Sequence, residues 1–213
     1  MGSLGAGTDI SNIHYRNVYS QNCNQMYMIK SYGGSGTVKN VKLENFWGHT
    51  NAYTLDLNAY WTSMTQAAGS GVSYQNVTFS NWKGTNSNGA QRGSIQVLCP
   101  SAVPCTGITI SDVNIWTESG SAEKEICQNA FGTGSCLRSD SGATYTTTVT
   151  RTTARYAPSI SSLQSNFVLW LTTVILKQLR YPNHAKRNQS LGPRYADPDS
   201  CDPNELFSWP EAH

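Results

Sequence analysis

A repeat of about 30 residues constrains the fold of this 213-residue chain more than any other feature. In each copy apolar and polar residues alternate, and the alternation ends at an Asn or Asp that an apolar residue follows. The four closing residues are 28, 36 and 31 positions apart, and they are Asn17, Asn45, Asn81 and Asp112. Alternation with a period of two is typical of strands with one buried face. A repeat of this length marks stacked units that share a continuous core.

Three further strand-like runs lie between the copies, at residues 26–30, 53–57 and 94–98. With turns rich in Gly, Asn and Ser and no helical pattern, they predict an all-β fold, a right-handed parallel β-helix. Each strand should then pair with its counterpart one turn later, about 4.8 Å away, and the four closing residues should stack at one corner. An up-and-down β-sandwich is the rival architecture. Because the first repeat begins within about ten residues of Met1 with no capping helix before it, we expect N-terminal coils to be missing.

The composition changes sharply near residues 150–158. Through Thr150 the chain has 17 of its 18 Gly but only two of its eight Pro. We therefore expect coils of the β-helix over residues 1–153 and an irregular tail over residues 154–213. The tail reads like translated intron or frameshifted sequence, and a partner-binding extension is the alternative.

Charge and hydropathy exclude several functional classes. The formal net charge is +2 and only 13% of residues are charged, so no strongly basic surface for nucleic acid is expected. The most apolar run, residues 167–176, is too short to span a membrane. Residues 1–10 have neither the basic nor the apolar region of a signal peptide. The chain as it stands would therefore remain inside the cell.

The cysteines indicate an oxidising compartment instead. Cys99 and Cys105, six residues apart, bracket two Pro, and Cys127 and Cys136, nine residues apart, bracket two Gly. Both pairs predict local disulfide loops, and zinc binding is the alternative, although the CxxC spacing is missing. Cys23 and Cys201 have no assigned partner, and a partner of Cys23 could lie N-terminal to Met1.

Three blocks of sequence then point to a family. Residues 1–5 (MGSLG), 24–53 (NQMYMIKSYGGSGTVKNVKLENFWGHTNAY) and 115–121 (IWTESGS) resemble, in the right order, the C-terminal half of fungal rhamnogalacturonases. These are polygalacturonase-like members of glycoside hydrolase family 28. The resemblance covers residues 1 to about 153. It implies a right-handed parallel β-helix, secretion, a monomer, no cofactor, and inverting hydrolysis of galacturonic acid–rhamnose linkages in pectin.

The resemblance also bears on the site. Inverting hydrolysis needs two carboxyl groups, roughly 6.5–9.5 Å apart. The family carries its acids in Asn-Thr-Asp and Asp-Asp motifs that precede the GSLG segment, so we assign no catalytic residue to this chain. Residues 28–30 (Met-Ile-Lys) match the family's Arg-Ile-Lys motif, which implies that Lys30 contacts a uronate carboxylate. Tyr60 resembles a groove tyrosine that positions substrate. A plain surface lysine and a core or corner tyrosine are the alternatives.

The remaining polar residues are expected to be structural or solvated. Asp56 alternates with two leucines and is read as solvated or groove-facing, and not as catalytic. His14 and His49 are read as solvated residues at strand ends without acidic partners. The acidic cluster of Glu118, Glu123 and Glu125 is read as a surface loop.

Two further possibilities concern glycosylation and a rival activity. Asn76 and Asn188 begin glycosylation sequons, although Asn76 lies within a predicted strand. A pectate lyase is a weaker rival function, because it would need a calcium site of clustered Asp, and the sequence contains no such cluster. No metal site is therefore assigned.

Overall fold

The computed structural model describes residues 2–87, 93–117, 119–139 and 142–151. The predicted tail, with Asn188 and Cys201, lies outside these residues, as does Glu118. The described strands are β1 (Ser3–Leu4), β2 (Thr8–Gln21), β3 (Gln25–Ser31), β4 (Gly36–Asn51), β5 (Tyr53–Asn58), β6 (Ser73–Asn86), β7 (Ile95–Leu98), β8 (Cys105–Thr117), β9 (Glu123–Gln128), β10 (Ala130–Thr133) and β11 (Thr146–Arg151). The described residues contain no helix long and apolar enough to cross a membrane.

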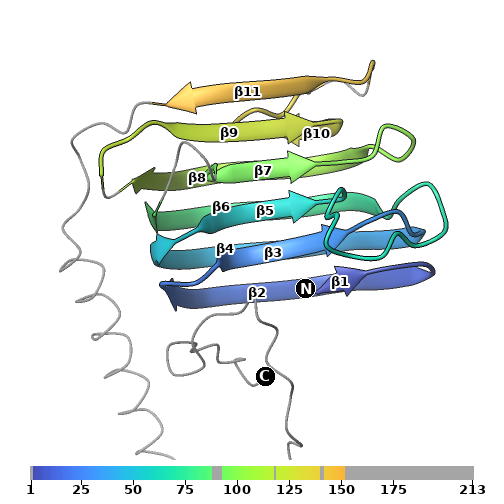
Figure 1. Cartoon of the computed structure of the whole chain (residues 1–213), viewed down its shortest axis with the longest axis horizontal. Coiled ribbons are helices and arrows are strands. Elements are labelled where there is room, and N and C mark those ends of the chain that lie inside the picture. The colour runs from blue at the N-terminus through green and yellow to red at the C-terminus, as the bar shows by residue number, and fades with distance from the viewer. Residues whose placement is uncertain (1, 88–92, 118, 140–141, 152–213) are drawn as a thin grey trace, which may run out of the picture.

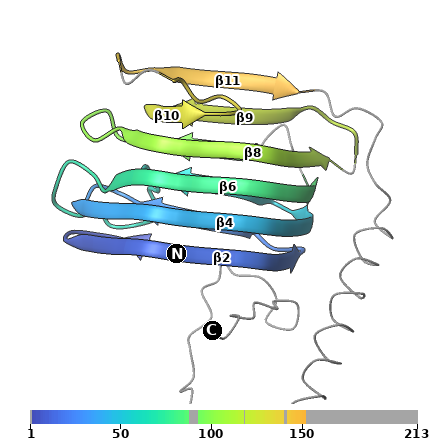
Figure 2. The same ribbon diagram turned by 180° about the vertical axis from the view of Figure 1, so that it is seen from behind.

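The strands form two sheets, and the chain alternates between them. Sheet A has the order β1-β3-β5-β7-β9-β11, and sheet B has the order β10-β8-β6-β4-β2. Figure 1 shows the strands of sheet A stacked one above another, and Figure 2 shows sheet B from behind. Neighbouring strands are parallel throughout, except that β11 runs antiparallel to β9. The prediction of an all-β fold is confirmed, and an up-and-down sandwich, in which neighbours are antiparallel, is excluded.

The register of sheet B follows the sequence repeat. Ile10 pairs with Val38, and Val38 pairs with Tyr74 on the next strand. Further along, Phe79 pairs with Ile110. These pairs reproduce the intervals of 28, 36 and 31 residues, so each strand does pair with its counterpart one repeat later. The strands of sheet B are longer than predicted, because they continue past the closing Asn or Asp.

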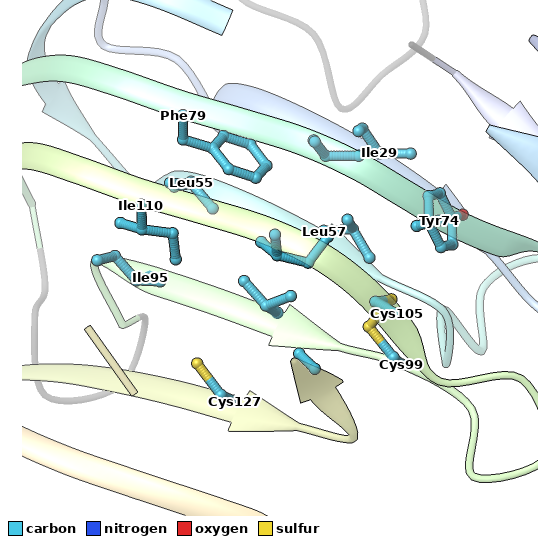
Figure 3. Close-up of a cluster of buried hydrophobic side chains, with 14 of the residues drawn as sticks. Ile29, Leu55, Leu57, Tyr74, Phe79, Ile95, Cys99, Cys105, Ile110 and Cys127 are labelled. Carbon is cyan, nitrogen blue, oxygen red and sulfur yellow. A yellow bond between two sulfur atoms is a disulfide. The ribbon is translucent and has the colours of Figure 1, made fainter. Parts of the chain in front are cut away.

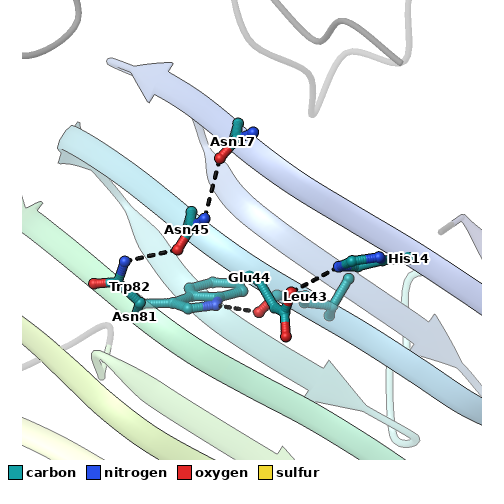
Figure 4. Close-up of polar contacts among 7 residues, drawn as sticks. All are labelled: His14, Asn17, Leu43, Glu44, Asn45, Asn81 and Trp82. Atoms are coloured by element: carbon teal, nitrogen blue, oxygen red, sulfur yellow. Dashed lines mark hydrogen bonds and ion pairs between the residues drawn. The ribbon is translucent and has the colours of Figure 1, made fainter. Parts of the chain in front are cut away.

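The closing residues form a ladder of amide side chains (Figure 4). The Nδ2 of Asn45 donates to the Oδ1 of Asn17 at 3.1 Å, and the Nδ2 of Asn81 donates to the Oδ1 of Asn45 at 2.7 Å. All four closing residues have positive φ, between 52° and 60°, a conformation that Asn and Asp tolerate better than most residues. The register confirms the predicted stacking for all four residues. The hydrogen bonds stop at Asn81, because the carboxylate of Asp112 has no hydrogen to donate to the Oδ1 of Asn81.

A second ladder of asparagine side chains lies before the closing residue of each repeat, and it was not predicted from the sequence. The Nδ2 of Asn40 donates to the Oδ1 of Asn12 at 3.1 Å, and the Nδ2 of Asn76 donates to the Oδ1 of Asn40 at 2.9 Å. All three residues have positive φ. In the next repeat Gly107 takes the same conformation at φ 65°, which a glycine adopts without strain.

The core fills the space between the two sheets. Figure 3 shows Ile29, Leu55, Leu57 and Ile95 projecting from sheet A toward side chains of sheet B such as Phe79. At the other end of the core, Phe46 and Trp82 stack with their ring centres 4.2 Å apart, and the indole N–H of Trp82 donates to the carbonyl of Leu43 at 2.9 Å. The apolar positions of the repeat are therefore buried, as the alternation predicted.

Both predicted disulfides are present. Cys99 is bonded to Cys105, and Cys127 is bonded to Cys136. The first bond joins the segment after β7 to the start of β8, and the second joins β9 to the segment after β10. These cysteines therefore do not bind zinc. Cys23 is buried among the described residues.

Candidate functional site

The outer face of sheet A carries polar side chains near the carboxyl ends of three strands, with Leu98 between two of them. The strand register places Lys30 opposite Asn58, Asn58 opposite Leu98, and Leu98 opposite Gln128. The residue before each of them belongs to the core, because successive side chains of a strand point to opposite faces. The outer face is therefore the surface on which polar residues of successive strands meet.

The structure brings together the two residues that the resemblance singled out. Lys30 is followed by Ser31, the last residue of β3, and the backbone N–H of Trp61 donates to the carbonyl of Ser31 at 3.1 Å. The Lys30 ammonium lies 5.6 Å from the centre of the Trp61 ring, within the range of a cation–π contact. Tyr60 directly precedes Trp61 in the chain and is bridged to Tyr32. The sequence analysis missed Trp61, although its position beside Tyr60 was a usable signal.

Tyr60 is held by hydrogen bonds while its ring stays accessible. Its hydroxyl donates to the carbonyl of Cys99 at 3.1 Å and accepts from the Nε2 of Gln128 at 3.3 Å. Its backbone N–H donates to the Oδ1 of Asn58 at 2.9 Å. The side chain is nevertheless 38% exposed. Tyr60 is therefore a surface residue with a fixed orientation, and not a core tyrosine.

A polar hollow lies next to this group. It has a volume of about 420 Å³ and is lined by Ser101, Gln128, Asn129, Thr144, Tyr145 and Thr146. Gln128 also contacts Tyr60, so the hollow adjoins the tyrosine. The hollow could not be predicted from the sequence, because its residues come from three separate segments that only the fold brings together.

Asp56 lies on the same outer face, opposite Met28 on β3 and Gln96 on β7. Its side chain is only 1% exposed, so of the two expected alternatives, solvated or groove-facing, the solvated one is wrong. Neither carboxylate oxygen has a hydrogen-bond partner among the described residues. Burial raises the pKa of Asp56 to about 7, because removal from water disfavours the charged form. In the described part of sheet A, Asp56 is the only acidic residue on the outer face.

Glu123 and Glu125 do not form a surface loop, and that expectation is wrong. Both lie in β9 and are 1% and 5% exposed, with Glu125 facing inward like its neighbour in register, Ile95. The Oε1 of Glu125 lies 2.7 Å from the Nε of Arg151, and its Oε2 accepts from the hydroxyl of Ser135 at 2.6 Å. Burial raises the pKa of Glu123 to about 7. Glu125 is paired with Arg151 and Ser135 at the end of the stack, and neither glutamate belongs to the outer face.

The expectation of a solvated histidine is confirmed for His14, whose side chain is 43% exposed, and is wrong for His49. His14 lies within β2, and its Nε2 is 2.7 Å from the Oε2 of Glu44 on the neighbouring strand (Figure 4). The sequence could not reveal this acidic partner, which is 30 residues away. Both ring nitrogens of His49 are buried, so His49 is not a solvated residue. Among the residues that the structure describes, no three His, Cys, Asp or Glu side chains gather as a metal site would require.

Comparison with known proteins gives a family. Residues 1–136 match the model of glycosyl hydrolases family 28. The chain is 56% identical over 168 residues to "Probable rhamnogalacturonase E" of Aspergillus flavus, a match that covers 78% of this chain and 37% of that protein. It is also 56% identical over 167 residues to "Rhamnogalacturonase A" of Aspergillus aculeatus, covering 78% of this chain and 38% of that protein. The chain thus spans well under half the length of these relatives.

Proposed function

Because the chain belongs to glycosyl hydrolases family 28, we propose that it forms part of a secreted rhamnogalacturonan hydrolase. The substrate is the galacturonic acid–rhamnose backbone of pectin, and the full-length enzyme is a monomer. Residues 1–153 make up the family part, and residues 154–213 are a different kind of sequence. The names of the relatives and the extent of the family match support this proposal.

The two sheets belong to a right-handed parallel β-helix in this proposal. The alternation of the chain between sheets A and B supports it, because each strand is followed one coil later by its parallel neighbour. Connections between parallel strands of one sheet are right-handed in nearly all proteins. Rungs stacked in this way place the side chains of successive strands along one groove.

The chain contributes the product side of that groove. Lys30 binds the carboxylate of a galacturonate, since an ammonium and a carboxylate form a charge-assisted hydrogen bond. The observation that carries this proposal is the grouping of Lys30, Tyr60 and Trp61 on one outer face. The cation–π contact holds the ammonium near an aromatic ring, and the rings of Tyr60 and Trp61 offer surfaces on which a sugar can stack.

The two carboxyl groups of inverting hydrolysis are supplied by residues outside the described part of this chain. One protonates the leaving oxygen and the other activates a water on the opposite face of the sugar. Asp56 is alone on the outer face of the described sheet and almost completely buried, so it has no second carboxyl group with which to form such a pair. The described residues therefore supply groups that bind pectin and not the catalytic pair.

Binding is tested by titrating the chain with rhamnogalacturonan oligosaccharides in a calorimeter. We expect Lys30→Ala to weaken binding about tenfold, which corresponds to about 1.4 kcal/mol. Lys39→Ala is the matched control, because Lys39 is an exposed lysine on sheet B. Equal affinities for the two variants would contradict the proposed role of Lys30.

Catalysis is tested by measuring the release of reducing ends from rhamnogalacturonan and homogalacturonan at mildly acidic pH. We expect no release above the buffer blank. Release that disappears in Asp56→Asn would show that Asp56 performs the chemistry, and it would overturn the proposal of a binding fragment.

Asn76 carries a glycan in the secreted protein under this proposal. Its side chain is exposed, and its Nδ2 donates to Asn40. A glycosylated Nδ2 retains one hydrogen for this bond, so modification is compatible with the ladder. Mass spectrometry after expression in a secretory host, with and without glycosidase treatment, tests this assignment.

A further inference from the structure

The hollow beside Tyr60 is lined by uncharged polar groups. Its six lining residues carry hydroxyl and amide groups, and none of them carries a formal charge. Ser101, Thr144 and Thr146 are exposed and Gln128 is partly exposed, so their polar atoms are accessible. Hydroxyl and primary amide groups both donate and accept hydrogen bonds. The hollow can therefore bind a polyhydroxylated molecule, but it offers no cation to balance a carboxylate.

The wall of the hollow is fixed by its own hydrogen bonds. The Nδ2 of Asn129 donates to the carbonyl of Cys99 at 3.0 Å, and its Oδ1 accepts from the backbone N–H of Tyr145 at 3.0 Å. The Tyr145 hydroxyl donates to the carbonyl of Ala130. The guanidinium of Arg138 packs on the Tyr145 ring, 4.3 Å from its centre, without lining the hollow. Because these groups are already ordered, a ligand would not have to order them on binding.

The hollow and Lys30 belong to one continuous surface. The Cys99 carbonyl accepts from both Tyr60 and Asn129, so it links the tyrosine to the wall of the hollow. In the row of paired residues, Lys30 and Gln128 are separated by three strand spacings, or about 14 Å. The cationic end of the surface is therefore distinct from its uncharged end, and a short oligosaccharide can reach both.

We propose that this hollow is a binding site for a neutral sugar, on the same face as the uronate site at Lys30. The inference rests on the proposed function, since a backbone that alternates uronate and deoxy sugar presents both kinds of ligand. The surface distinguishes the uronate from the deoxy sugar, because it is cationic at one end and uncharged at the other. The carboxylate is bound at the cationic end, and the neutral deoxy sugar is bound where its hydroxyl groups meet Gln128 and the threonines.

The site is tested by titrating the ¹⁵N-labelled chain separately with L-rhamnose and D-galacturonate and following the amide resonances. We expect rhamnose to shift the amides of Ser101, Gln128 and Thr146. Thr146→Trp fills the hollow and should weaken rhamnose binding at least about tenfold. Thr150→Trp is the matched control, because Thr150 is an exposed threonine of the same strand and face that does not line the hollow. It should bind rhamnose as the parent does.

Ser101→Trp provides a second filling variant on another segment of the wall, in case Thr146→Trp fails to fold. Rhamnose that leaves the hollow amides unshifted, or that binds both filling variants like the parent, would overturn the inference. So would galacturonate that occupies the hollow in preference to rhamnose. The proposed function is checked separately, because its failure would remove the galacturonate shifts around Lys30 without affecting rhamnose at the hollow.

Discussion

At the scale of single residues, the buried carboxyl group of Asp56 should make the stability of the chain depend on pH. Burial raises its pKa from 3.8 to about 7 in the folded chain, so the folded state favours the protonated form. The stability that this preference contributes is fully present below pH 4 and is lost as the pH rises through 7. Asp56→Asn removes the charge and should raise the free energy of unfolding at pH 7.5 by about 2–4 kcal/mol, with little change at pH 4.

Urea denaturation of the parent chain and of Asp56→Asn at pH 4 and pH 7.5 measures this difference in the free energy of unfolding. Asp9→Asn is the control, because Asp9 is exposed and its replacement should change stability by less than about 0.5 kcal/mol. Glu123 titrates in the same direction, so part of the pH dependence should persist in Asp56→Asn. An unchanged pH dependence in that variant would show that the carboxyl group is not buried in solution.

The burial of Asp56 is a property of a single residue that could not be predicted from the sequence. The resemblance to a family singled out Lys30 and Tyr60; the Lys30 ammonium lies near the ring of Trp61, the residue that follows Tyr60. Alternation could give the face of Asp56 but not its exposure, because exposure depends on what covers the sheet. The acidic partner of His14 could not be predicted either, since Glu44 becomes its neighbour only when the strands pair.

At the scale of elements, the amide ladders explain why the corners repeat. Asn45 both donates to Asn17 and accepts from Asn81, and it holds a φ of 60°. Asn45→Ala loses two hydrogen bonds and places a less tolerant residue in the left-handed region, which should cost about 3 kcal/mol. Asn45→Gly loses the same bonds without the backbone strain and should cost about 1 kcal/mol less. Chemical denaturation measures the free energy of unfolding of both variants. Equal decreases in the two variants would contradict the proposed contribution of backbone strain.

The end of the first ladder offers a gain in stability. The Oδ1 of Asn81 is buried without a partner among the described residues, and Asp112 occupies the next position in register. Asp112→Asn supplies the missing donor and retains the tolerance for positive φ, so it should stabilise the chain by about 1 kcal/mol. For a chain of this size the unfolding midpoint should rise by about 2–4 °C. Differential scanning calorimetry measures the rise, and a rise of the same size in Asp9→Asn would attribute it to net charge instead.

Some strands could be predicted from the alternation of apolar and polar residues, and others could not. The repeats and the three intervening runs correspond to β2 to β8, because their inward positions are apolar. In β9 Glu125 occupies an inward position, and its carboxylate is neutralised by Arg151 from β11. A hydrophobic pattern cannot reveal a strand whose buried position is charged, so the end of the stack was missed.

At the scale of the whole molecule, the stack should be less stable at its β11 end than at its centre. Each coil contacts only its neighbours, and in such folds stability is a sum of local terms. Strands β5 and β6 have partners on both sides, whereas β10 and β11 lie at the edges of their sheets in the described part of the chain. The two disulfides join the segment after β7 to β8, and β9 to the segment after β10, and they stabilise this weaker end.

Hydrogen exchange of the backbone amides tests this gradient, with and without reduction of the disulfides. In the oxidised chain we expect amides of β11 to exchange at least about tenfold faster than those of β5. Opening a short disulfide loop should cost about 2–3 kcal/mol, so reduction should accelerate exchange in β9 to β11 by about 30- to 160-fold and leave β5 nearly unchanged. Equal acceleration in every strand would instead show that the stack unfolds as one cooperative unit. The hollow is lined by residues at the end of β9 and the start of β11 together with Ser101. Selective loosening of this end should therefore also weaken rhamnose binding, while the Lys30 end retains its affinity for galacturonate.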